Sequence, residues 1–140
     1  MEGKFELPQK LATLSLFGLG VFVDIRGVYW FVNQESVLNE SEFYEALHEV
    51  MPIWLWGFLF LIFGTCLILA SLFFGKRSIN NISNYFMLIG GTGSAIIHFL
   101  MASAGIYNAI NWLTPAQFVV MTAWLGFVGF MGGVDIYGRR

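Results

Sequence analysis

The feature that most constrains this chain is an apolar segment, residues 85–107, that contains no Asp, Glu, Lys or Arg. A helix needs roughly 20 apolar residues to cross the hydrocarbon core of a bilayer, so this segment is long enough to span one. Three other segments share its length and character. The sequence therefore predicts four spanning helices, over about 11–32, 53–74, 85–107 and 116–137.

The composition indicates the same class of protein. Hydrophobic residues make up 57% of the 140 residues and charged residues only 11%, whereas about a quarter of the residues in a soluble domain are charged. The length allows one domain, residues 1–140. We therefore expect an all-α integral membrane protein of the cell membrane, built as a four-transmembrane-helix bundle whose main surroundings are the lipid bilayer.

The basic residues predict the orientation of the bundle. The two connections over residues 33–52 and 108–115 contain no Lys or Arg. All of the basic residues that flank the spans fall on the opposite side: Lys4, Lys10, Lys76, Arg77, Arg139 and Arg140. Because basic residues concentrate on the cytoplasmic side, both termini are predicted to be cytoplasmic.

The first external connection is predicted to contain one short amphipathic surface helix, over about residues 40–51. Asn39 and Glu42 have the spacing of a capping box, and Phe43 and Leu47 fall on one helical face. Its acidic residues are Glu40, Glu42, Glu45 and Glu49. This helix either shields the end of the bundle or forms an acidic collar, defined by these four glutamates, that attracts cations.

Small residues recur at helical spacing in three of the predicted spans, and on the first span Thr13, Gly20, Asp24 and Gly27 line one side. Gly91 and Ala95 lie on one face of the third span, and Gly126, Gly129 and Gly133 lie on one face of the fourth. Such faces let two helix backbones approach closely. They are predicted helix-packing faces, either within the bundle or between protomers.

Ionisable residues within the spans are candidates for function, because a charge is costly at the centre of a bilayer. Asp24 and His98 are each roughly 20 Å from the cytoplasmic ends of their helices, at 1.5 Å per residue. We hypothesise that they meet as a mid-membrane gate or proton relay, or else as a structural hydrogen bond. Arg26 is expected to extend outward against Trp30 as a membrane anchor.

Motifs for catalysis or for metal binding are missing from the sequence: there is no paired-cysteine motif, no His-x-x-x-His and no cluster of carboxylates in a span. We therefore predict no enzymatic activity, catalytic residue, metal or cofactor, and no basic surface suits a nucleic acid. The favoured function is a homo-oligomeric pore or channel, which includes holin-like membrane permeabilisers. The alternatives are an accessory subunit of a larger membrane complex and, with least support, a membrane enzyme or quinone-binding protein that uses His98.

Overall fold

The computed structural model describes residues 6–76, 80–108 and 111–138, and every regular element in these ranges is helical. The bounds are α1 Leu7–Val32, α2 Gln34–Leu38, α3 Glu42–Val50, α4 Ile53–Phe73 followed by the 3-10 turn η1 Phe74–Lys76, α5 Ile82–Asn108 and α6 Leu113–Tyr137. In the described residues, four helices are long and apolar enough to cross a membrane: α1, α4 with η1, α5 and α6. The prediction of four such helices is confirmed.

The connection between α1 and α4 differs in detail from the expectation. It contains two short helices rather than one, and α3 begins at Glu42 because the preceding Ser41 is extended (φ −168°, ψ 155°). Asn39 does not cap α3. It ends α2 instead, where its side-chain amide donates a hydrogen bond to the carbonyl oxygen of Glu35 at 2.8 Å.

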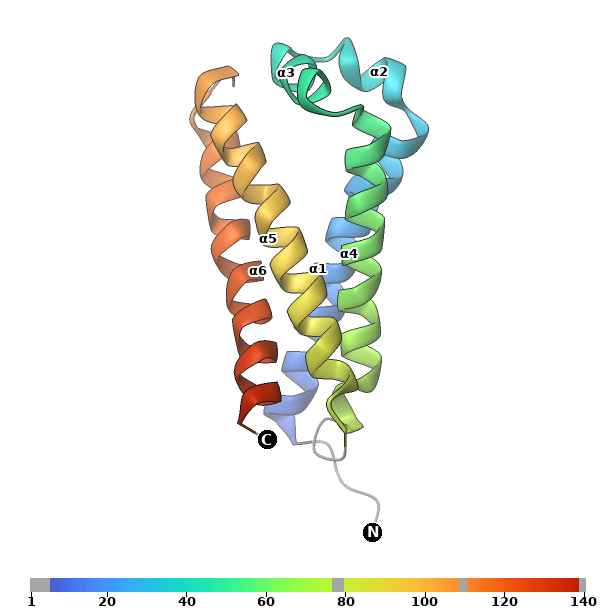
Figure 1. Cartoon of the computed structure of the whole chain (residues 1–140), viewed down its shortest axis with the longest axis vertical. Coiled ribbons are helices and arrows are strands. Elements are labelled where there is room, and N and C mark those ends of the chain that lie inside the picture. The colour runs from blue at the N-terminus through green and yellow to red at the C-terminus, as the bar shows by residue number, and fades with distance from the viewer. Residues whose placement is uncertain (1–5, 77–79, 109–110, 139–140) are drawn as a thin grey trace.

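The four long helices form two closely packed pairs, α1 with α4 and α5 with α6 (Figure 1). The pairs are joined chiefly through α4 and α5, whereas α1 and α6 make almost no direct backbone contact. Figure 1 shows the two pairs diverging toward the end that carries α2 and α3, with α3 lying across that end. The chain traverses the bundle four times. The start of α1 and the end of α6 therefore lie at the same end of the bundle, opposite to α2 and α3.

Glycines set the close approach within the first pair. A Cβ atom added at Gly20 would lie 2.8 Å from the carbonyl oxygen of Gly64, and one at Gly27 would lie 2.8 Å from that of Gly57. Both distances are below normal van der Waals contact, so only glycine fits at these points. The two helices therefore pack backbone against backbone along their length.

The second pair uses glycine in the same way. A Cβ atom at Gly91 would lie 2.5 Å from the backbone nitrogen of Gly129, and one at Gly132 would lie 2.6 Å from the carbonyl oxygen of Asn84. Ala95 is buried nearby. The seam between α5 and α6 thus contains three of the predicted packing residues and Gly132, which the sequence pattern did not single out.

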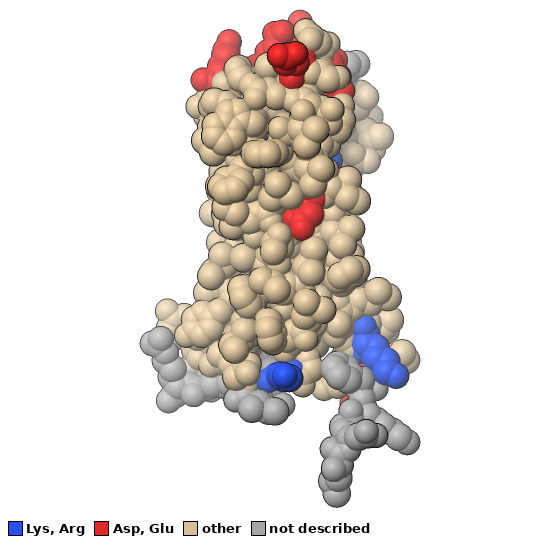
Figure 2. Space-filling view, turned by 90° about the vertical axis from the view of Figure 1, so that its right-hand side faces the viewer, with Lys and Arg blue, Asp and Glu red and all other residues tan. Residues whose placement is uncertain are grey.

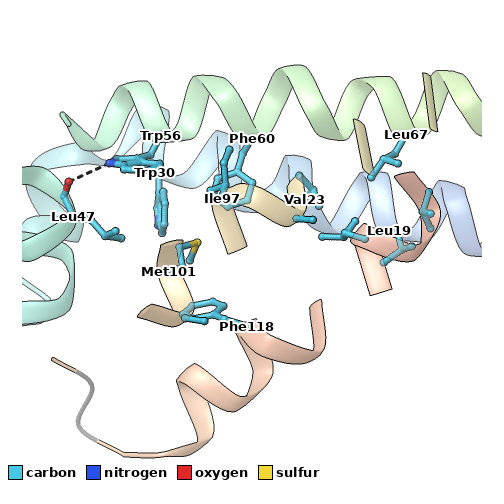
Figure 3. Close-up of a cluster of buried hydrophobic side chains, with 14 of the residues drawn as sticks. Leu19, Val23, Trp30, Leu47, Trp56, Phe60, Leu67, Ile97, Met101 and Phe118 are labelled. Atoms are coloured by element: carbon cyan, nitrogen blue, oxygen red, sulfur yellow. Dashed lines mark hydrogen bonds between the residues drawn. The ribbon is translucent and has the colours of Figure 1, made fainter. Parts of the chain in front are cut away.

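The space between the pairs is filled by large apolar side chains (Figure 3). Trp30, Phe60 and Met101 are each at most 2% exposed. At the α3 end, the indole nitrogen of Trp56 donates a hydrogen bond to the carbonyl oxygen of Leu47 at 3.1 Å, drawn as a dashed line in Figure 3. This bond and the burial of Leu47 hold α3 against the bundle.

Charge is divided between the two ends of the molecule. Figure 2 shows acidic side chains at the α2–α3 end, basic side chains at the opposite end and a nearly uncharged flank between them, broken by one acidic patch and by a small basic area at the edge of the view. Of the basic residues used to predict orientation, Lys10 and Lys76 are described and exposed. Lys4, Arg77, Arg139 and Arg140 lie outside the described residues.

Candidate functional site

Asp24 lies on the α4 side of α1, near the middle of the helix. Its carboxyl group occupies the notch left by Gly64, where a Cβ atom would overlap Oδ1. The hydroxyl of the exposed Thr65 donates to Oδ2 at 3.4 Å, while Oδ1 is buried without a hydrogen-bond partner. No cationic side chain among the described residues lies beside it. Asp24 and Thr65 therefore form a polar spot, partly exposed, on the flank of the α1–α4 pair.

His98 lies in a different environment, inside the bundle. It is 1% exposed, and its ring lies between those of Phe60 and Phe118, with centroids 5.2 and 6.2 Å away. Nδ1 donates to the carbonyl oxygen of Ser94 at 2.8 Å in the tautomer that this geometry requires, and Nε2 has no hydrogen-bond partner in the described chain.

The structure does not bring Asp24 and His98 together within one chain. The hydrogen bonds of Asp24 run to Thr65 on α4, and those of His98 run to its own helix. The two side chains have different neighbours because Asp24 points to the outside of the α1–α4 seam, whereas His98 points between the two helix pairs.

Arg26 lies on the side of α1 that faces α6, away from Asp24. Its guanidinium carbon is 5.0 Å from the ring centroid of Phe118 and 5.8 Å from that of Phe22, distances typical of cation–π contacts. The expected contact with Trp30 is not formed. Trp30 is 2% exposed and packs edge-on against Phe60 and Tyr44, so it belongs to the core and not to an outward-facing anchor.

A polar hollow of about 220 Å³ opens beside Arg26 at the α3 end. Its lining comes from α1, α3, α5, α6 and the connections before α3 and α6: Arg26, Ser41, Phe43, Tyr44, Asn108, Asn111, Thr114, Gln117 and Phe118. Burial raises the pKa of Tyr44, and the nearby Arg26 guanidinium partly offsets this rise. The hollow therefore joins one cation to several neutral hydrogen-bonding groups.

The four glutamates of the acidic collar are exposed at the same end of the molecule. Glu40 accepts a hydrogen bond from the hydroxyl of Tyr29, which ties α1 to the segment before α3. The other three, on α3, face away from the apolar residues that pack on the bundle. The collar is thus a rim around the α3 end and contributes no residue to the polar hollow.

Two of the predicted packing glycines are not at a close contact. A Cβ atom at Gly126 would approach no nearer than 3.8 Å to Ala95, and one at Gly133 no nearer than 3.5 Å to Leu88. Both line an apolar groove of about 740 Å³ along the outside of the α5–α6 pair. Gly129 packs between α5 and α6. Gly126 and Gly133, which have no side chains, lie along the groove on the outer face of this pair.

Sequence reasoning did not select Thr65, Tyr44 or Gln117. Thr65 is a hydroxyl residue within a strongly apolar run, and that contrast is the signal that could have drawn attention to it. Tyr44 on α3 and Gln117 on α6 come close to Arg26 only through tertiary packing around the polar hollow. Among the described residues, no group of three or more His, Cys, Asp or Glu side chains is placed to hold a metal ion.

Comparisons with protein families, characterised proteins and solved structures give no match to this chain. The class therefore follows from the fold alone: over the ranges that the structure describes, the protein is all-helical and has four helices long and apolar enough to span a membrane.

Proposed function

We propose that this chain is an integral membrane protein with four membrane passes and both termini in the cytoplasm. The support is the length and apolarity of α1, α4, α5 and α6, together with basic flanking residues at only one end. A reporter fused to the C-terminus should read as cytoplasmic, and one inserted at Glu40 as external. The reverse pattern would invert the orientation, and equal labelling of both sites would remove the membrane assignment.

Within that membrane we propose that the chain assembles as a homo-oligomeric pore or channel, with Asp24 at the contact between protomers or facing the pore. The observation that supports this is the polar spot of Asp24 and Thr65 on the flank of the α1–α4 pair. A carboxyl group near the centre of a bilayer costs at least about 2.5 kcal/mol when it faces lipid. A neighbouring protomer or a water-filled path removes that cost.

His98 takes no part in this contact, because its side chain is enclosed by α4 and α6. We assign it to the interior of each protomer and assign Asp24 alone to the proposed pore. The exposed collar of glutamates at the external end would raise the local concentration of cations near the entrance. The proposed permeant species is therefore a cation.

Cross-linking tests the assembly. Thr65→Cys in a Cys66→Ser background should give disulfide-linked dimers in membranes, because Thr65 is exposed beside Asp24. Ile96→Cys is the depth-matched control: Ile96 is twelve residues from the α3-proximal end of α5, as Thr65 is on α4. Equal cross-linking at both positions would indicate random collision and contradict the proposed contact.

Flux tests the activity. In proteoliposomes, Asp24→Asn should lower potassium flux at least about tenfold, since a charged partner contributes more than about 1.4 kcal/mol to a polar contact. Glu6→Gln, the same chemical change at the exposed opposite end of the molecule, should leave flux unchanged. A monomeric protein that conducts nothing and co-purifies with larger polypeptides would favour the accessory-subunit alternative instead.

A further inference from the structure

The side of α1 opposite to Asp24 carries a second feature, where two hollows of different character meet. The polar hollow described above adjoins an apolar groove of about 560 Å³ between α1 and α6. The two share Arg26, Gln117 and Phe118. The remaining lining of the groove is almost entirely apolar: Phe22, Leu113, Ala116, Val120, Met121 and Trp124.

The groove exists because α1 and α6 belong to different helix pairs. They make almost no direct backbone contact, and the pairs diverge toward the α3 end (Figure 1). On α6 the groove runs from Leu113 to Trp124, twelve residues that span about 16 Å of helix at 1.5 Å per step. Half the thickness of a bilayer hydrocarbon core is about 15 Å, so the groove matches the depth of one leaflet.

Arg26 gives this composite hollow its charge. The guanidinium lies against two aromatic rings, and no Asp or Glu lines either hollow in the described chain. A cation held between apolar helices without a carboxylate partner favours an anionic ligand. The side chains of Ser41, Tyr44 and Asn108 add hydroxyl and amide donors around it.

We infer that the α1–α6 seam binds one anionic phospholipid from the leaflet at the α3 end. The phosphate occupies the polar hollow and pairs with Arg26, and one acyl chain lies in the apolar groove toward Trp124. Charge complementarity and the length of the groove point to this occupant, because a free anion would leave the apolar half empty. The inference rests on the proposed membrane insertion but not on the proposed pore.

Lipid titration of the purified full-length chain in dodecyl maltoside tests the assignment. Phosphatidylglycerol should bind the wild type, as counted by native mass spectrometry, and raise its melting temperature. Phosphatidylcholine should do so at least about tenfold more weakly, because its choline cation masks the phosphate charge. Arg26→Gln should weaken phosphatidylglycerol binding by about the same factor. Lys10→Gln, the same loss of charge at the opposite end, should not.

A second variant examines the groove separately from the charge. Ala116→Phe places a ring in the apolar half, so it should weaken phosphatidylglycerol binding while Arg26 remains in place. The inference is overturned if Arg26→Gln binds phosphatidylglycerol like the wild type, or if the two lipids bind equally. It is also overturned if inorganic phosphate alone stabilises the wild type as much, since the ligand would then be a free anion.

The outcomes separate this inference from the proposed pore. If lipid binding depends on Arg26 but the protein conducts no ions, the proposed lipid site is supported and the proposed pore is rejected. Flux that depends on Asp24, without a preference for the anionic lipid, would do the opposite.

Discussion

Replacing Gly27 by alanine measures how closely α1 and α4 approach. The added Cβ atom would lie 2.8 Å from the carbonyl oxygen of Gly57 and 2.9 Å from the backbone nitrogen of Leu61. Both neighbours are backbone atoms and cannot rotate away. Because ordinary contact begins at 3.4 Å, the helices must separate locally by about 0.6 Å, the difference between 3.4 and 2.8 Å.

The free-energy cost of this clash can be measured against Gly18→Ala. Gly18 lies on the same helix, and a Cβ atom added there has nothing within 4 Å. Alanine is favoured over glycine within a helix by roughly 0.5–1 kcal/mol, and both variants gain this preference. The difference between them therefore isolates the clash, for which overpacking costs typically about 1–3 kcal/mol. We expect Gly27→Ala to be less stable than Gly18→Ala by that amount.

The assay is unfolding by sodium dodecyl sulfate in mixed micelles, followed by circular dichroism. If the free energies of unfolding of the two variants agree within about 0.5 kcal/mol, the ordinary error of such comparisons, the close approach of α1 and α4 is refuted. A Gly18→Ala variant that is itself strongly destabilised would contradict the open surroundings of Gly18 and remove it as the reference.

Two further predictions concern the other contacts of the bundle. Gly132→Ala should destabilise the α5–α6 pair, since its Cβ atom would lie 2.6 Å from the carbonyl oxygen of Asn84, whereas Gly126→Ala should be neutral or stabilising in the same unfolding assay. If the two variants changed the free energy of unfolding equally, Gly132 would not lie at the close contact between α5 and α6. Trp56→Phe removes the hydrogen bond to Leu47 and should cost about 1 kcal/mol. Hydrogen exchange should then rise in α3 and not elsewhere, and unchanged exchange in α3 would show that the bond does not hold it.

The sequence alone determined the number and the approximate extent of the long helices. Each span is a local property, set by a run of apolar residues without charge, and such a run needs no knowledge of its neighbours. The relative position of the termini follows as well, because four passes return the chain to the end where it began. The short helix α2 escaped prediction, since five residues carry too little periodicity.

The partners of the small-residue faces needed the tertiary structure. The pattern on α6 contained Gly126, Gly129 and Gly133, but only Gly129 packs backbone against backbone. Gly132, one residue from Gly133, takes the second close contact with α5. Neighbouring positions on a helix point about 100° apart, so a small rotation of α6 decides which glycine meets its partner.

The surroundings of the ionisable residues were likewise decided by packing. The number of residues from the end of each helix gives the depth of Asp24 and His98 in the bundle, but it does not give the direction in which each side chain points. That direction places Asp24 on the outside of the α1–α4 seam and His98 between Phe60 and Phe118. It also turns Arg26 toward Phe118 on α6, a residue far away in sequence. Depth is local to one helix, whereas direction is set by contacts among all four.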